Sequence, residues 1–305
     1  MDGIFFLVLA FLVAFSSIKL SYYGDALSKQ TKLGSAFIGG LLIASITSLP
    51  EFITSISAVL INNPALSFGD ILGSNMFNIF VLSLYNIWFF KQNLFKNTNK
   101  KYIIECVILI TEYLLILVAT YINFVDIVTV SLLFMYFLYT IKVIKNKNEE
   151  IDSSFNEKYI GIKFIFFSIV LIVLSILLTL EADKITHIYP KISSSSIGAI
   201  LLGITTSLPE VVSTYALIKY KNYNMAISNI LGSNIFNFLV LAISDIFIRN
   251  NHIYNYSDSY SYMYLFGGII ITTLLLMCIY KKKHLLLLSI IMSLSYLLVW
   301  YFQFR

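Results

Sequence analysis

The sequence has little charge, few cysteines and few histidines. Only 12% of its 305 residues are charged, about half the share of a typical soluble domain. Cys106 and Cys278 are the only cysteines and both lie inside apolar runs, so we interpret them as buried thiols and not as a disulfide or a metal pair. The lysines sit in short loops and form no patch that would indicate nucleic-acid binding.

Long apolar runs dominate the sequence. The chain is 58% hydrophobic, and runs long enough to cross a bilayer recur along its whole length. They predict an all-α polytopic membrane protein with no separate soluble domain. The first run lacks a basic region and a cleavage site, so we interpret it as a span and not a signal peptide. We expect ten transmembrane helices, at about 3–22, 34–60, 65–90, 102–123, 125–145, 160–182, 195–219, 224–248, 262–280 and 285–303.

The basic residues predict the orientation of these spans. Of the 21 lysines and arginines, 17 fall in the loops that follow the odd-numbered spans, and 4 fall on the other side. Loops rich in lysine and arginine stay in the cytoplasm. We therefore expect an integral protein of the cell membrane with both termini outside and the short linker 146–159 in the cytoplasm.

Two stretches of the chain match each other at an offset of 159 residues. Residues 34–82 align with residues 193–241 without a gap, and 19 of the 49 positions are identical. The matching residues include the pentapeptide Thr-Ser-Leu-Pro-Glu, which ends at Glu51 in the first copy and at Glu210 in the second. A second block, Ile-Leu-Gly-Ser-Asn-x-Phe-Asn, follows in both copies. Apolar composition alone does not align proline with proline and glutamate with glutamate, so this is an internal repeat.

The repeat predicts the architecture. Five spans, an odd number, separate the two copies, so the copies cross the membrane in opposite directions. We predict two inverted-topology repeats of five helices each, residues 1–145 and 160–305, joined by the linker 146–159. This arrangement is typical of secondary transporters, which bind their substrates near the midplane where broken helices meet.

Each pentapeptide places a proline inside a predicted span. Pro50 and Pro209 remove a backbone donor and displace the carbonyls of the preceding turn from their usual partners. In a membrane these carbonyls require protein, water or an ion. The carbonyls concerned lie near Ala44, Ile46 and Thr47 in the first copy, and near Gly203, Thr205 and Thr206 in the second.

Each pentapeptide also places a carboxylate at membrane depth. Acids inside spans are costly and usually mark an ion pathway. Helical spacing puts each glutamate on the face of the hydroxyls three and four residues before it. Every candidate ligand is an oxygen, which suits Ca²⁺ or Na⁺, and two glutamates would neutralise one Ca²⁺. The candidate side chains are Glu51, Glu210, Thr47, Thr206, Ser48, Ser207, Ser74, Ser233, Asn78 and Asn237.

Simpler interpretations remain for other polar residues. The serines and asparagines of the second block could serve hydrogen bonding between helices. We expect Asp70, whose repeat mate is Asn229, to be a solvated acid near the start of its span, with a role in drawing cations inward as the alternative. Asp245 is expected to be solvated, and Glu112 to be a neutral, hydrogen-bonded acid.

The paired motifs resemble the two α-repeats of the calcium:cation antiporter superfamily, and within it the prokaryotic Na⁺/Ca²⁺ exchanger-like proteins. The resemblance implies ten helices, alternating access by sliding of the first and sixth spans, and exchange of cytoplasmic Ca²⁺ for external Na⁺. It implies transported ions and no cofactor, and it indicates no obligate protein partner. It also implies an ion site made of the ten side chains named above together with the backbone carbonyls of Ala44 and Gly203.

One departure from the family pattern leaves the counter-ion open. In several exchangers one of the two positions Asn78 and Asn237 is an aspartate, and here both are asparagine. A H⁺-coupled or other monovalent-coupled Ca²⁺ antiporter of the same fold is therefore the alternative. A channel is less compatible with an inverted two-fold repeat, and an intramembrane enzyme lacks a nucleophile–base pair.

Overall fold

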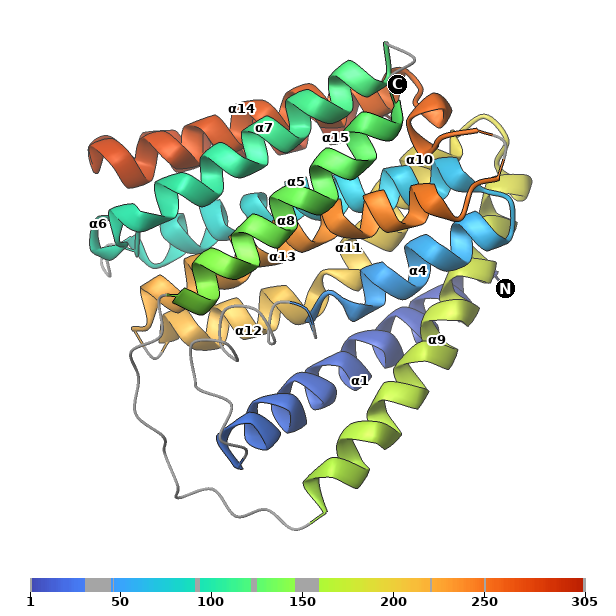
Figure 1. The fold of residues 1–305 in the computed structure, drawn as a ribbon, viewed down its shortest axis with the longest axis horizontal. Helices are drawn as coiled ribbons and strands as arrows, with labels where there is room; N and C mark the ends of the chain where they lie inside the picture. The colour runs from blue at the N-terminus through green and yellow to red at the C-terminus, as the bar shows by residue number, and fades with distance from the viewer. Residues whose placement is uncertain are drawn as a thin grey trace.

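The computed structural model describes residues 2–30, 45, 47–90, 94–121, 125–145, 159–219, 221–249 and 251–303. Every regular element in these ranges is a helix (Figure 1). The helices of ten or more residues are α1 (Asp2–Gln30), α4 (Leu49–Leu60), α5 (Pro64–Trp88), α7 (Ile103–Ala119), α8 (Val125–Lys145), α9 (Ile160–Ile188), α12 (Leu208–Lys219), α13 (Tyr223–Ile246), α14 (Ser259–Lys281) and α15 (Leu285–Gln303). The short ones are α6 (Leu94–Asn97), η3 (Lys100–Tyr102), α10 (Ser194–Ile197), the π-helical η4 (Gly198–Leu202), α11 (Gly203–Thr206) and η5 (Ile253–Tyr256).

Eight of these helices are long and apolar enough to cross a membrane: α1, α5, α7, α8, α9, α13, α14 and α15. A ninth candidate is the pair Ser194–Thr206 and Leu208–Lys219, bent by 42°. Together they match nine of the ten predicted spans, which confirms the all-α polytopic class. Of the span predicted at 34–60, the structure describes α4 and a few residues before it, and the rest lies outside the described residues. The count of ten remains a prediction.

The two central helices begin in the same way. The Asn63 side chain accepts a hydrogen bond from the Leu66 amide at 3.3 Å and caps α5. Its repeat mate Asn222 accepts one from the Met225 amide at 3.3 Å and caps α13. Asparagine is favoured at this position because its side chain satisfies an amide that the first turn leaves free. The matched caps fix where the polar residues of each helix fall.

Helices α5 and α13 form the centre of the bundle. Helix α5 contacts α4, α13, α14, α15 and the segment from α10 to α11, and α13 contacts α12, α4, α7 and α8. In Figure 1 the outer helices α7 and α14 lie on one side of this centre, while α1 and α9 lie on the other. Most side chains of α5 and α13 are buried although many are polar, so these two helices carry the polar interior.

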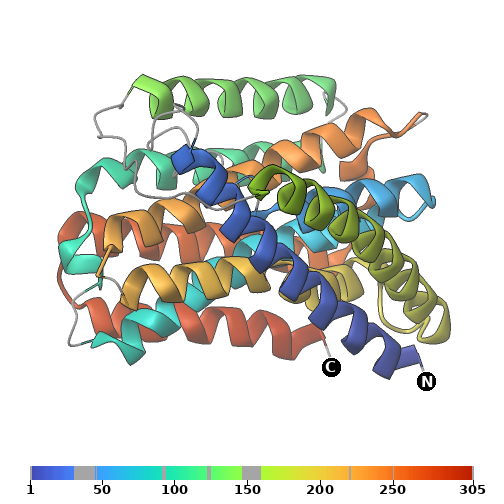
Figure 2. The same cartoon turned by 90° about the horizontal axis from the view of Figure 1, so that it is seen from below.

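Helices α1 and α9 form a separate layer. They pack along each other and contact α4, α11 and α12, and Figure 2 shows them crossing one face of the bundle. Their buried apolar side chains, among them Val13, Leu171 and Leu178, form a hydrophobic cluster with Ala58 of α4 and Leu66 of α5 that is distinct from the main core. Their other faces expose large apolar side chains, such as Phe11 at 70%, as expected for contact with lipid.

Glycines allow α5 to pack against the segment from α10 to α11 without side chains between them. A Cβ atom at Gly73 would overlap the backbone of Ala199, and one at Gly198 would overlap the carbonyl of Leu66. Small residues permit such approach in membrane bundles. This close packing brings the backbone carbonyls of the bent segment near α5.

Candidate cation site

Two helix breaks lie at corresponding positions in the repeats. Ser48 (φ −89°, ψ 12°) precedes α4, and Ser207 (φ −82°, ψ 1°) precedes α12. The proline two residues later lacks an amide, so the preceding helix cannot continue its hydrogen bonding through it. Each break puts a glutamate, Glu51 or Glu210, in the first turn of the new helix. The free amides at a helix N-terminus favour negative charge there.

The glutamates are held across the repeat and not within it. Ser48 Oγ donates to Glu210 Oε1 at 2.8 Å, and Ser207 Oγ donates to Glu51 Oε1 at 3.0 Å. Thr47 also lies beside the Glu210 carboxylate. Helical spacing placed each serine with the glutamate of its own copy, whereas in the structure each serine donates to the glutamate of the other copy. The crossed pairs bring both carboxylates to one centre.

The central helices and the bent segment add further oxygens. Ser233 Oγ lies 3.3 Å from Glu210 Oε1, and Ser74 Oγ donates to the Gly203 carbonyl at 3.2 Å. Thr206 Oγ1 donates to the Leu202 carbonyl at 2.9 Å. The segment that contributes these carbonyls is π-helical immediately before Gly203, and π-helical turns frequently occur at functional sites.

A crossed network of hydrogen bonds joins α5 and α13 through Asn75 and Asn234, which were not among the predicted site residues. Asn75 Nδ2 donates to the Asn234 carbonyl at 3.2 Å, and Asn234 Nδ2 donates to the Asn75 carbonyl at 2.9 Å. Their side-chain oxygens accept 2.9 Å hydrogen bonds from the amides of Asn237 and Asn78, respectively. The signal was present in the sequence, because both asparagines belong to the repeated block. The network fixes the amide groups of Asn78 and Asn237.

Four buried oxygens at this centre have no hydrogen-bond partner among the described residues: Glu51 Oε2, Glu210 Oε2, Asn78 Oδ1 and Asn237 Oδ1. All four side chains are 0% exposed. Buried polar atoms are normally satisfied, and an isolated buried carboxylate is very costly. The described part of the chain buries no lysine, arginine or histidine side chain. A cation from outside the chain is the partner that fits these atoms.

The chemistry of the oxygens restricts the kind of cation. Carboxylate, amide, hydroxyl and carbonyl oxygens are hard ligands that suit Ca²⁺ and Na⁺. Across the described ranges, histidine, cysteine, aspartate and glutamate side chains form no metal-binding group of three or more. Neutral oxygens would therefore have to complete the coordination around Glu51 and Glu210.

Eleven of the twelve residues predicted for the site are described in the structure. The twelfth, Ala44, lies outside the described residues. The eleven are all buried: Glu51, Glu210, Thr47, Thr206, Ser48, Ser207, Ser74, Ser233, Asn78, Asn237 and Gly203.

Three expectations for the remaining acids are wrong. Asp70 is not solvated but 0% exposed, because α4 and the segment from α10 to α11 pack over the start of α5. Asp245 is 5% exposed, because the chain after α13 folds back and the Ile253 amide donates to it at 2.7 Å. Glu112 is buried as expected, but neither of its carboxylate oxygens has a hydrogen-bond partner among the described residues.

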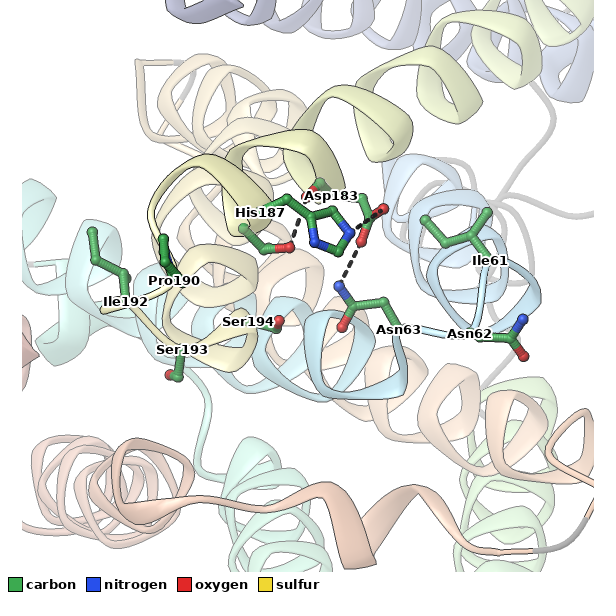
Figure 3. Close-up of a pocket in the computed structure, with 10 residues that line it drawn as sticks. Ile61, Asn62, Asn63, Asp183, His187, Pro190, Ile192, Ser193 and Ser194 are labelled. Carbon is green, nitrogen blue, oxygen red and sulfur yellow. Dashed lines mark hydrogen bonds and ion pairs between the residues drawn. The ribbon is translucent and has the colours of Figure 1, made fainter.

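A polar hollow of about 530 Å³ lies apart from the central residues, between the end of α9, the turn before α5 and the start of α10 (Figure 3). Asn63 Nδ2 donates to Asp183 Oδ1 at 2.7 Å, and His187 Nε2 lies 3.6 Å from Asp183 Oδ2. None of the residues predicted for the cation site lines it. The hydrogen bond joins α9 to the cap of α5.

Comparison with known families gives a match over nearly the whole chain. The model for the family described as sodium/calcium exchanger protein matches residues 3–145 and 160–305. The uncharacterized membrane protein MJ0091 of Methanocaldococcus jannaschii is 29% identical over 239 residues, which cover 71% of this chain and 74% of that protein. The inner membrane protein YrbG of Escherichia coli is 24% identical over 253 residues, which cover 75% of this chain and 74% of that protein.

Solved structures of the sodium-calcium exchanger NCX_Mj have a similar fold. The structure soaked with 2.5 mM Na⁺ and 0.1 mM Sr²⁺ has a TM-score of 0.66 and 23% identity, and covers 98% of both chains. The structure soaked with 10 mM Na⁺ and 10 mM Sr²⁺ has a TM-score of 0.65 and 22% identity, and covers 97% of both chains. At this level of identity the similarity establishes the fold.

Proposed function

This chain belongs to the sodium/calcium exchanger protein family, and from that premise we propose that it is a secondary active antiporter that exchanges Ca²⁺ for Na⁺ by alternating access. The observation that carries the proposal is the set of four buried, unpartnered oxygens on Glu51, Glu210, Asn78 and Asn237. They lie in a polar interior whose described part buries no basic side chain. Two glutamates balance the charge of one Ca²⁺, and Na⁺ would compete for the same oxygens.

The ligands we propose are those that the two repeats bring to the centre. Glu51 and Glu210 supply the charge, and the amide oxygens of Asn78 and Asn237 supply neutral ligands. The hydroxyl oxygens of both breaks and of the central helices complete the set, together with the carbonyls of Gly203 and Ala44. The neutral ligands are Thr47, Thr206, Ser48, Ser207, Ser74, Ser233, Asn78, Asn237, Gly203 and Ala44.

An inverted repeat accounts for the pairing of the helices. The contact of α4 with α9 has its counterpart in that of α12 with α1, and the contact of α5 with α15 in that of α13 with α8. Such exchanged contacts are expected when a two-fold axis relates residues 1–145 to residues 160–305. That arrangement supports two alternative accesses to one central site.

The packing of α1 and α9 supports the motion. Their apolar side chains form, together with Ala58 of α4, Leu66 of α5 and Leu202 of the bent segment, a cluster separate from the main core. Movement of the pair would therefore rearrange this cluster and leave the main core packed. We propose that sliding of α1 and α9 exposes the site to one side of the membrane at a time. The distribution of lysine and arginine supports a cytoplasmic linker at 146–159 and external termini.

Radioactive Ca²⁺ uptake into proteoliposomes tests this function. Vesicles loaded with Na⁺ and diluted into Na⁺-free buffer should accumulate Ca²⁺, while vesicles with no gradient should not. Vesicles containing the Glu51→Gln variant serve as the control and should remain at background. Uptake driven only by a pH gradient would replace Na⁺ with H⁺ as the counter-ion. Flux that needs no counter-ion would contradict the antiporter and favour a channel.

A further inference from the structure

The two repeats differ in charge at one buried position of the polar interior. Asp70 of α5 corresponds to Asn229 of α13, and the two residues are 0% and 2% exposed. The residues that contact them also correspond, because Thr54 and Ser55 of α4 match Ser213 and Thr214 of α12. The difference is therefore a single carboxylate in an otherwise repeated environment.

The hydrogen bonds at this position join corresponding residues in the two repeats. Asp70 Oδ2 lies 2.7 Å from Thr54 Oγ1 and 3.3 Å from Ser55 Oγ, and both hydroxyls can donate to it. Thr54 Oγ1 also lies 2.8 Å from the Pro50 carbonyl. In the second repeat, Asn229 Nδ2 is the donor, to Ser213 Oγ at 2.9 Å and to Thr214 Oγ1 at 3.2 Å. An ionised Asp70 can only accept, so beside it the single Thr54 hydrogen points to Asp70 and not to the Pro50 carbonyl, whereas Asn229 donates through its Nδ2 atom.

Asp70 also reaches the proposed cation site. Its Oδ1 atom lies 3.4 Å from Thr206 Oγ1, which belongs to the bent segment that carries Gly203. It is near enough to Glu51 for the two carboxylates to repel each other. No metal-binding group of three acids is found in the described ranges, so Asp70 is a neighbour of the two glutamates and does not share one ion with both. Its place is at the Thr206 end of the site.

We propose that Asp70 strengthens cation binding at the Thr206 end of the site, as a third carboxylate that the second repeat lacks. The proposal rests on the proposed cation site and specifies its asymmetry. The described part of the chain buries no basic side chain that could balance this charge, so a cation in the site would do so. Because charges interact more strongly in a protein interior than in water, the effect extends to an ion that Asp70 does not touch.

Exchanging the two residues separates the charge from the fold. The Asp70→Asn variant makes the first repeat like the second, and Asn229→Asp makes the second like the first. Each purified protein is heated in detergent at mildly alkaline pH, with CaCl₂ or NaCl titrated against choline chloride at constant ionic strength. The melting temperature without Ca²⁺ or Na⁺ is measured separately from its rise with each cation.

Loss of the charge should weaken binding without weakening the fold. Asp70→Asn should raise the Ca²⁺ concentration for half-maximal stabilisation about tenfold, while the melting temperature without the cations stays the same or rises, because repulsion with Glu51 is relieved. Asn229→Asp should do the reverse, with a lower melting temperature in the absence of the cations and a larger rise on adding them.

The opposite pattern would overturn the inference. If Asp70 is only a hydrogen-bond acceptor, Asp70→Asn lowers the melting temperature without the cations and leaves both titrations unchanged. Should that variant not fold, an unchanged titration for Asn229→Asp overturns the inference equally. If the melting temperature of the wild-type protein responds to neither Ca²⁺ nor Na⁺, the proposed cation site itself is overturned. If the wild type responds and Asp70→Asn responds in the same way, only the role of Asp70 is overturned.

Discussion

The two repeats make the same polar contacts twice, and most of these contacts join one repeat to the other. Ser48 reaches Glu210 at 2.8 Å, and Ser207 reaches Glu51 at 3.0 Å. The amides of Asn78 and Asn237 each donate across the centre at 2.9 Å. Neither repeat can complete these contacts alone. The carboxylates are positioned only when both halves of the chain are packed together.

The repeats differ at two positions near the site that take no part in these crossed contacts. The second repeat has Gly203 where the first has Ala44, and the first has Asp70 where the second has Asn229. The glycine permits close backbone approach at one end of the site, and the aspartate places a charge at the same end. The shared contacts form the frame of the site, and these two substitutions distinguish its ends.

The largest effect should follow from removing either central carboxylate. Glu51→Gln and Glu210→Gln should each reduce the initial rate of Na⁺-driven Ca²⁺ uptake at least about a hundredfold. Removing one partner of a buried charge interaction, here the carboxylate that faces the cation, costs about 3 kcal/mol or more. The crossed contacts predict that the two losses are similar. The measurement is tracer uptake in proteoliposomes with equal amounts of each protein.

The matched control for these variants is Glu105→Gln. Glu105 is a buried glutamate that pairs with Lys142 at 2.9 Å on the outer helices α7 and α8. Its loss should leave uptake within a few-fold of wild type. A rate near wild type in Glu51→Gln but not in Glu210→Gln would contradict a site shared equally by both repeats.

The crossed asparagines should come next in effect. Asn75→Ala and Asn234→Ala each leave a buried amide and a buried carbonyl without their partners, which costs about 1–3 kcal/mol of stability. The amide of Asn237 or Asn78 then loses its orientation, so the apparent Ca²⁺ affinity should fall about tenfold. Melting temperature and Ca²⁺ titration measure the two effects.

Asn86→Ala is the control that tests whether loss of any buried asparagine of α5 lowers the Ca²⁺ affinity. Asn86 is also buried in α5, but its amide donates to Ser289 of α15 at 2.9 Å and not to the asparagines of α13. It should lower the melting temperature with no change in Ca²⁺ affinity. An equal affinity loss in Asn86→Ala and Asn75→Ala would show that the crossed network has no specific role.

A smaller effect should follow from making the bent segment more like its first-repeat counterpart. A Cβ atom at Gly203 would lie 2.8 Å from the Ser74 backbone nitrogen, so Gly203→Ala must displace backbone. Overpacking of this kind costs about 1–3 kcal/mol, and the displaced carbonyl should weaken cation affinity. Gly161→Ala is the control, because nothing lies within 4 Å of the added atom; it should leave the melting temperature the same or raise it. A harmless Gly203→Ala would contradict the close approach.

The repeated motifs indicated most residues of the candidate site. Residues identical in both copies, such as Glu51 and Glu210, could be assigned to one centre because an inverted repeat must bring its copies together. The partners of Ser48 and Ser207 could not be predicted, since helical spacing relates residues within one segment and the observed hydrogen bonds cross between segments. Asn75 and Asn234 carried the same signal of repetition but were not assigned a contact.

The expectations for the acids depended on tertiary packing that the sequence does not encode locally. Asp70 was expected to be solvated because it lies near the start of a span, yet the bent segment, whose glycines allow close approach, covers it. Asp245 was expected to be solvated for the same reason at the other end of a span. The Ile253 amide and the Thr129 hydroxyl enclose it instead.

The smallest effect should follow from removing one crossed hydroxyl. Ser48→Ala deletes the 2.8 Å hydrogen bond to Glu210, while Ser233 still lies 3.3 Å from the same oxygen. Ser207→Ala deletes the 3.0 Å hydrogen bond to Glu51, whose Oε1 atom accepts no second hydrogen bond from a hydroxyl of the described residues. A net contribution of about 1 kcal/mol per hydrogen bond corresponds to about a fivefold loss of uptake rate, so Ser207→Ala should be the more affected of the two. Tracer uptake at subsaturating Ca²⁺ resolves such a difference, and a larger loss in Ser48→Ala would place the greater dependence on Glu210.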